Sequence, residues 1–255
     1  MLAKNDYSRL SADLVDALAL QRSPVAICFA DTVPNGLNAP PHRVPAGCRF
    51  WEDATSSSFA TSAVDHNMCA IGVYTHNLEP SPAQQADLMD AIKVFGDLGY
   101  VRPEDLPLIP VLAAQPKHVL YSPLAETPLP PDLVILFVNA SQTLILSEAV
   151  QQVEGGNAPA MGRPACAVVP QVMNSGRAAL SLGCCGARAY LSLLTESVSV
   201  FALPGARIEA YAERIVTLAK ANGLLSQFHR IRGESIIAGH SPTVQDSLRA
   251  LAASE

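Results

Sequence analysis

The 255-residue sequence is poor in the features that mark several large classes of protein. Aromatic residues make up only 5% of it, so a core must be mostly aliphatic. Its 17 lysines and arginines are scattered without a basic run, and the net charge is −6. A general nucleic-acid-binding protein would carry a basic face, so we expect no nucleic-acid partner.

Signals for membranes, export and common enzyme classes are also missing. No window reaches the 18 apolar residues of a membrane helix, and residues 1–9 hold no apolar stretch of signal-peptide type. We therefore expect a cytoplasmic protein without a membrane partner. The sequence has no phosphate-binding loop, no G-x-G-x-x-G after a strand, no G-x-S-x-G and no H-E-x-x-H.

Apolar residues account for 49% of the chain, which is enough for a sizeable core. Four runs that are apolar nearly throughout predict buried central strands: 24–30, 132–138, 165–169 and 197–203. Between and after these runs, stretches with N-cap signals or an amphipathic pattern predict helices at 82–98, 139–153 and 206–222. The alternation indicates an α/β fold with a mixed, largely buried sheet flanked by helices.

This pattern favours a single α/β domain over residues 1–225. Residues 226–255 are expected to form a polar C-terminal tail with a weak helix near 244–252. A proline followed by an apolar run occurs at both 24–28 and 164–168. This short match leaves two pseudo-repeated halves as an option.

Six cysteines are spread along the chain: Cys28, Cys48, Cys69, Cys166, Cys184 and Cys185. In a cytosolic chain of this size, metal binding or thiol chemistry is commoner than disulfide bonding. Cys28 lies inside the apolar run 24–30, and we interpret it as a packed core thiol. The others fall mostly at predicted element boundaries beside glycines, where their side chains could reach a shared site.

The stretch Ser181-Leu-Gly-Cys-Cys-Gly-Ala-Arg188 places two adjacent cysteines at a predicted strand-to-helix corner. Glycines there let the backbone take positive φ and approach a ligand closely. The free N–H groups of a following helix favour anions and thiolates. Adjacent side chains point in different directions, so we expect only one of Cys184 and Cys185 to act as ligand or nucleophile.

Four thiolates gathered from distant segments suit an iron–sulfur cluster or a structural zinc ion. The spacings match no standard ferredoxin motif, and the close cysteine pairs of zinc knuckles are absent. The sequence therefore favours an iron–sulfur cluster held by Cys48, Cys69, Cys166 and one of the pair. Zinc is the alternative, and so is no metal, with free thiols in a reducing compartment.

Two polar residues are candidates for binding a small molecule near these cysteines. His66 is three residues before Cys69 and could orient it or ligate with it, although a single histidine is more often structural. Arg188 could hold an anionic substrate or donate to cluster sulfides. Its alternative role is that of an ordinary arginine on a helix surface.

An ordered set of motifs resembles a known family. It comprises Pro24-Val-Ala-Ile, Cys48, His66-x-x-Cys69-x-x-Gly72, Asp132-Leu-Val-Ile-Leu-Phe-Val-Asn139, Cys166-Ala-Val-Val-Pro170, Gly183-Cys184-x-Gly-x-Arg188 and Val200-Phe-Ala-Leu-Pro204. Over residues 10–222 this is similar to the domain-of-unknown-function 169 (ArCR) family of bacteria and archaea. The family pattern implies that Cys184 is the invariant position and Cys185 the variable one. It implies no agreed activity.

Three functions remain open from the sequence. The first is a cysteine-ligated metal protein, iron–sulfur by preference, that acts on or senses a small molecule, with an anionic one as an option, or serves a redox partner. The second is a metal-free thiol enzyme with Cys184 as nucleophile, activated by His66 or Arg188. The third is a non-catalytic small-ligand-binding protein. Whether the protein is an enzyme, and whether it forms a homo-oligomer, is left open.

Overall fold

The computed structural model describes residues 4–66 and 68–253. Residues 1–3 of the predicted 1–225 domain, Asn67, and residues 254–255 of the predicted tail lie outside the described residues. The strands are β1 (Val25–Ala30), β2 (Phe59–Thr61), β3 (His118–Pro123), β4 (Leu133–Asn139), β5 (Ala160–Met161), β6 (Ala179–Ser181) and β7 (Val198–Pro204). The α-helices are α1 (Lys4–Leu18), α2 (Arg49–Asp53), α3 (Ala70–Thr75), α4 (Pro82–Asp97), α5 (Ala140–Val153), α6 (Val168–Ser175), α7 (Cys185–Tyr190), α8 (Ile208–Ile237) and α9 (Val244–Ala252).

The seven strands form one mixed sheet in the order β2-β3-β1-β4-β7-β6-β5. Every neighbouring pair is antiparallel except β5 and β6, which are parallel. The central strands β1, β4 and β7 are buried along most of their length, as their apolar runs predict. The predicted α/β fold with a mixed, covered sheet is confirmed.

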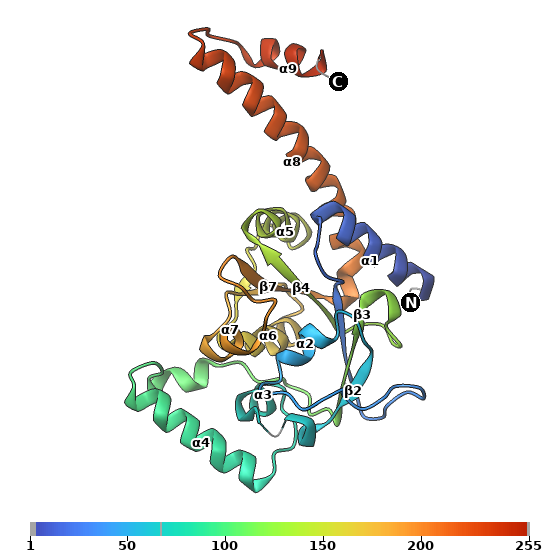
Figure 1. The fold of residues 1–255 in the computed structure, drawn as a ribbon, viewed down its shortest axis with the longest axis vertical. Helices are drawn as coiled ribbons and strands as arrows, with labels where there is room; N and C mark the ends of the chain where they lie inside the picture. The colour runs from blue at the N-terminus through green and yellow to red at the C-terminus, as the bar shows by residue number, and fades with distance from the viewer. Residues whose placement is uncertain (1–3, 67, 254–255) are drawn as a thin grey trace.

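Alternate side chains of the central strands enter two separate cores, one on each face of the sheet. On the face that we call the aliphatic face, α1, α5 and α8 pack over residues such as Val134, Leu136 and Leu203. On the opposite face, which we call the cysteine face, α2, α3, α6 and α7 pack over residues such as Ile27 and Ile135. Figure 1 shows the helices disposed on both sides of the sheet.

One predicted strand is wrong. Residues 165–169 form a turn of 3₁₀ helix, η4 (Ala165–Ala167), that leads into α6. A short apolar run is equally compatible with a buried helix, because every side of this segment is covered. The match between 24–28 and 164–168 therefore joins a strand to a helix and does not mark a repeat.

Two helical segments extend away from the sheet (Figure 1). The helix α4, capped by Ser81 and Gln84 as predicted, contacts α3 and leaves most of its side chains exposed. The helix predicted to end at residue 222 continues to Ile237, and α9 folds back beside it. Within the described residues, no helix is long and apolar enough to cross a membrane.

Candidate functional site

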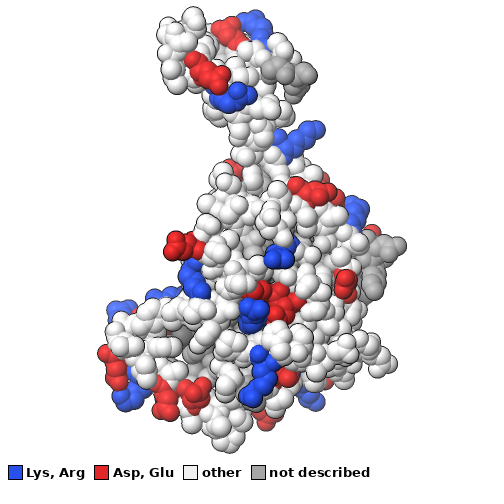
Figure 2. Space-filling view, in the orientation of Figure 1, with Lys and Arg blue, Asp and Glu red and all other residues white. Residues whose placement is uncertain are grey.

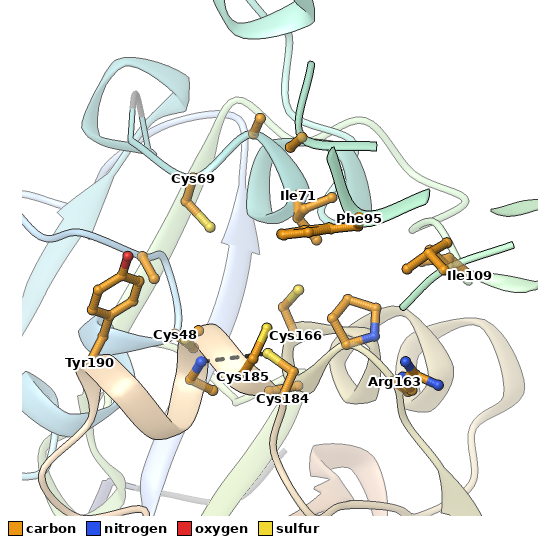
Figure 3. A pocket seen from close by; sticks show the side chains of 18 of the residues that line it. Cys48, Cys69, Ile71, Phe95, Ile109, Arg163, Cys166, Cys184, Cys185 and Tyr190 are labelled. Carbon is orange, nitrogen blue, oxygen red and sulfur yellow. Dashed lines mark hydrogen bonds between the residues drawn. The ribbon is translucent and has the colours of Figure 1, made fainter. Parts of the chain in front are cut away.

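A cavity of about 440 Å³ opens on the cysteine face. Five of the six cysteines line it: Cys48, Cys69, Cys166, Cys184 and Cys185. The opposite wall is mostly apolar and comes from α4 and residues 100–109, including Phe95 and Ile109. Figure 3 shows Cys69 projecting from one wall toward the thiols of Cys166, Cys184 and Cys185 on the other. The structure thus gathers five thiols from four distant segments around one space.

The cysteines that sequence motifs predicted to act together occupy equivalent local positions. Cys48, Cys69 and Cys184 are the N-cap residues of α2, α3 and α7. Cys166 lies in η4, immediately before α6. Each thiol therefore sits where a loop on the cysteine face turns into a helix, and the first turn of that helix fixes its direction.

Four of these thiols are electrostatically coupled, and two of the four, Cys48 and Cys166, are also buried. Burial raises the pKa of the Cys48 thiol far above its ordinary value, and the nearby Cys166, Cys69 and Cys184 raise it further. Burial likewise raises the pKa of Cys166, with Cys69 and Cys184 adding to the rise. These thiols are therefore protonated at neutral pH, and holding them together as thiolates requires a compensating cation.

Cys69 has the most specific surroundings of the group. Burial raises its pKa, but the backbone N–H groups of Gly47 and Gly72 donate hydrogen bonds to the sulfur and oppose that rise. A methyl group on Gly72 would lie 2.9 Å from Sγ of Cys69, and one on Gly47 would lie 3.9 Å from it. A side chain at position 72 would displace the sulfur, whereas one at position 47 would collide with Nδ1 of His66 at 2.7 Å. The two glycine N–H groups form a cradle for a negatively charged sulfur.

Behind the cradle lies His66, which is buried and does not line the cavity. The hydroxyl of Thr61 donates to the carbonyl of Val119, so it accepts from Nε2–H of His66 at 3.2 Å. Nδ1 of His66 then carries a lone pair, and no hydrogen-bond partner for it exists among the described residues. Burial lowers the pKa of His66 to about 3, with His76 as a second cause, so the ring is neutral at physiological pH. The observed contacts of His66 are structural and hold the ring behind the cradle. That His66 binds a ligand stays a prediction.

The adjacent cysteines at the start of α7 differ in their surroundings. Sγ of Cys184 accepts the backbone N–H of Ala187 at 3.5 Å, as the dashed line in Figure 3 marks, and the residue is half-buried. Cys185 is exposed, although it also lines the cavity. The coupling that raises the pKa of Cys48 and Cys166 includes Cys184 and does not include Cys185. This difference supports Cys184 as the member that faces the other thiols.

Arg188 does not line the cavity. Its guanidinium donates to the carbonyl of Thr195 at 2.6 Å and also to the carbonyl of Leu182. These bonds fasten the loop between α7 and β7 to the strand that precedes the paired cysteines. The observed role is structural, and the predicted anionic ligand for Arg188 stays a prediction.

Sequence reasoning missed the charged residues that do line the cavity: Asp87, Asp105 and Arg163. The guanidinium of Arg163 lies 4.6 Å from the centre of the Tyr100 ring and donates to the Tyr100 carbonyl at 3.0 Å. No motif identifies these residues. The hydrogen bond between Arg163 and Tyr100 joins residues that are 63 positions apart in the sequence. The place of Arg163 at the cavity therefore depends on the fold and leaves no local pattern.

Cys28 lies outside this group, as predicted. It is buried with Ala60 and Leu120 in a small separate core, and its thiol lies 3.7 Å from the Thr127 hydroxyl. Burial raises its pKa to about 11. Among the described residues, no three histidine, cysteine, aspartate or glutamate side chains are grouped to hold a metal ion. The cavity thiols therefore surround a space and do not converge on a point.

A family model described as uncharacterised ArCR, domain of unknown function 169, matches residues 13–214. No curated protein and no solved structure matches the chain. The resemblance drawn from the sequence motifs is confirmed. The matched span contains every cysteine of the cavity and ends inside α8, before the segment that projects from the body.

Proposed function

The chain belongs to the uncharacterised ArCR family, and we propose that it is an iron–sulfur protein that acts on or senses a small molecule bound in the cysteine-lined cavity. The proposed ligands are Cys48, Cys69, Cys166 and Cys184. The single observation that carries the proposal is the gathering of these buried or half-buried thiols, from four segments, around one cavity. All six cysteines are free of disulfide bonds, which is consistent with a cytoplasmic location.

The energetics of the thiols support a bound cation. Packed, unligated cysteines behave as small apolar side chains and do not require N–H donors. Here the Cys69 sulfur receives two backbone N–H groups, and the Cys184 sulfur receives one. Hydrogen bonds to thiolate sulfurs are a recurrent feature of iron–sulfur sites, where they help to set the reduction potential.

The arrangement of the thiols favours a cluster over a single zinc ion. Zinc draws four ligands to about 2.3 Å from one point, and no such group exists among the described residues. A cluster spreads its ligands over two or more iron atoms, one thiolate per iron in a [4Fe–4S] cluster, so the ligands surround a volume. When bound, a cluster would supply electron transfer or a Lewis-acidic iron.

The rest of the cavity defines the class of small molecule. The wall opposite the thiols is mostly apolar, with Ile71, Phe95 and Ile109 among its side chains, and Asp87 and Asp105 also line the cavity. Asp105 is paired with Arg102 and also interacts with the charge of Arg163. Arg163, which stacks on Tyr100, is the cationic side chain among the described lining residues. The cavity therefore suits an apolar or amphipathic molecule with one anionic group placed at Arg163.

A metal-free thiol enzyme is the second candidate, and one observation favours it: the N–H of Ala187 donates to the Cys184 sulfur. The activating groups are missing, however. His66 is buried outside the cavity lining, and its pKa of about 3 makes it a weak base; the Arg188 guanidinium is bonded to carbonyl groups. We therefore rank this function below the iron–sulfur one.

The test is anaerobic purification followed by iron, acid-labile sulfide and zinc analysis with visible spectroscopy. The proposal predicts brown protein with iron and sulfide in similar amounts and little zinc. Cys184→Ser should lower the iron content strongly, because serine is a poor, harder ligand, whereas Cys185→Ser should change it little. Colourless wild-type protein without iron, both as isolated and after reconstitution with iron and sulfide, would rule the function out. The reverse result for the pair would mean that Cys185 is the ligand.

A further inference from the structure

The C-terminal hairpin, residues 221–252, stands apart from the rest of the molecule. The first half of α8 packs on α1 and α5 through side chains such as Tyr211 and Ile215. Beyond residue 220, α8 contacts mainly α9, and the two project from the body (Figure 1). Arg232 ties the hairpin together by donating to the carbonyl of Pro242 at 2.9 Å.

The hairpin keeps one apolar face uncovered. In α9, the exposed Val244 and Leu248 are four residues apart and so share a face. In α8, Leu225 and Ile236 are eleven residues apart, which is three helical turns, and also share a face. Large apolar side chains of the hairpin stay between 40% and 88% exposed: Leu224, Leu225, Ile236, Ile237, Val244 and Leu248.

Such a hairpin needs further packing to be stable. Isolated helices shorter than about 12–15 residues are marginal in water, and α9 has nine residues. Two helices alone cannot enclose a core, whereas two copies of a helical hairpin can form a four-helix bundle. A twofold axis achieves this with identical surfaces, which is the commonest symmetry of soluble oligomers.

The charges on the hairpin fit a second copy of this chain better than a membrane or a nucleic acid. Three arginines and two acidic residues are present, so the hairpin is nearly neutral while the whole chain carries −6. Arg230 pairs with Glu234, and Arg249 pairs with Asp246. Figure 2 shows both signs interspersed on the hairpin among uncharged atoms. A membrane or nucleic-acid site would need an excess of unpaired cations, whereas two nearly neutral hairpins approach each other without repulsion.

The available apolar area is consistent with a modest dimer. Full burial of an aliphatic side chain removes roughly 60–120 Å² of apolar surface, so the six exposed side chains offer on the order of 300 Å² per copy. A standard interface buries about 800 Å² per partner, a little over half of it apolar. We propose that the C-terminal hairpin pairs with the hairpin of a second copy to form a homodimer, independently of what the cavity binds.

The test is the mass of the full-length chain in solution, by sedimentation equilibrium from low-micromolar to high-micromolar concentration. Wild-type protein should shift from the 26.9 kDa monomer to twice that mass. Leu225→Glu and Leu248→Glu should each weaken dimerisation by roughly tenfold or more, because each would bury a charge in the interface. Leu144→Glu, at a similarly exposed leucine on α5, is the matched control and should dimerise like wild type.

Circular dichroism and iron content, measured on the same samples, separate loss of pairing from loss of fold. Both should be unchanged in the two hairpin variants, since the substituted side chains are exposed and remote from the cavity lining. Wild-type protein that stays monomeric at every concentration overturns the proposal, even if it binds another protein or vesicles. A dimer that resists both hairpin substitutions also overturns it, because the interface then lies elsewhere.

Discussion

The two faces of the sheet are packed with different kinds of side chain. The core of the aliphatic face holds leucine, valine, isoleucine, alanine and a few aromatic residues, with no cysteine among its described members. The cysteine face holds a cavity, four electrostatically coupled cysteines, and the buried pair His66 and His76. Buried polar atoms without hydrogen-bond partners destabilise a fold, and Nδ1 of His66 and Nε2 of His76 are such atoms among the described residues. Their location on the cysteine face indicates a role other than packing.

The largest expected contrast is in metal content. Cys69→Ser should lose most of the iron of anaerobically prepared protein, because this thiol has the two-glycine cradle and no substitute beside it. Cys28→Ser removes a buried thiol of the same type outside the cavity and should retain the iron. Iron per polypeptide, measured on folded protein of both variants, checks this. Equal loss in the two would mean that iron content follows stability alone.

The aliphatic face should show the opposite behaviour. Leu146→Ala, at a fully buried position on α5, should lower the free energy of unfolding by about 2–5 kcal/mol through lost burial and a cavity. The iron content of the fraction that remains folded should not change, since Leu146 is remote from the cavity lining. Chemical denaturation and metal analysis on one preparation provide both numbers. Loss of iron without loss of stability would remove the distinction between the faces.

The buried histidines make the cysteine face sensitive to acid. Burial lowers the pKa of His76 to about 4, below the unfolded value of about 6.5, so the unfolded chain takes up the proton first. The stability from neutral His76 is present above pH 6.5 and is lost as pH falls toward 4, by about 2 kcal/mol at pH 5. His66, at 6.0 Å between ring centres and with a pKa of about 3, acts in the same direction.

His76→Asn separates the two histidines. Nδ1 of His76 donates to the carbonyl of Gly72 at 3.0 Å, and an asparagine amide can replace that bond without titrating. The metal-free variant should therefore lose about 2 kcal/mol less than wild type between pH 7.5 and pH 5 in denaturation experiments. Parallel pH profiles for the two proteins would show that His76 does not titrate on unfolding.

The smallest expected effect is at the cradle. The added methyl group of Gly72→Ala would lie 2.9 Å from the Cys69 sulfur, so the sulfur must move and its N–H contacts lengthen. Weaker hydrogen bonds to a ligand sulfur stabilise the reduced cluster less, so the reduction potential should fall while iron is retained. Gly223→Ala on α8, where nothing lies within 4 Å, is the control. A potential that matches the control would mean that the cradle does not influence the site.

Much of the fold could be predicted, because β1, β4 and β7 are buried along most of their length and appear in the sequence as nearly continuous apolar runs. The segment 165–169 could not be assigned correctly, since a buried 3₁₀ turn leading into a helix has the same apolar composition. The end of α8 was also missed, because Gly223 and a fading apolar period suggest an end that α9 packing overrides.

The candidate site was predictable only in part. The cysteines stand out in the sequence because few other residues bind soft metals, and glycines beside three of them indicate close approach. Arg163, Asp87 and the apolar wall of α4 reach the cavity through tertiary packing alone, which leaves no local pattern. The bonds from Arg188 to backbone carbonyls depend in the same way on a loop whose path only the fold defines.

X-ray absorption at the iron edge of anaerobically prepared full-length protein tests the central claim most directly, because it reports the atoms bound to iron. The account predicts that sulfur dominates the first shell and that iron neighbours lie beyond it, as in a cluster ligated by Cys48, Cys69, Cys166 and Cys184. A first shell of nitrogen and oxygen, or isolated iron atoms without iron neighbours, would contradict it.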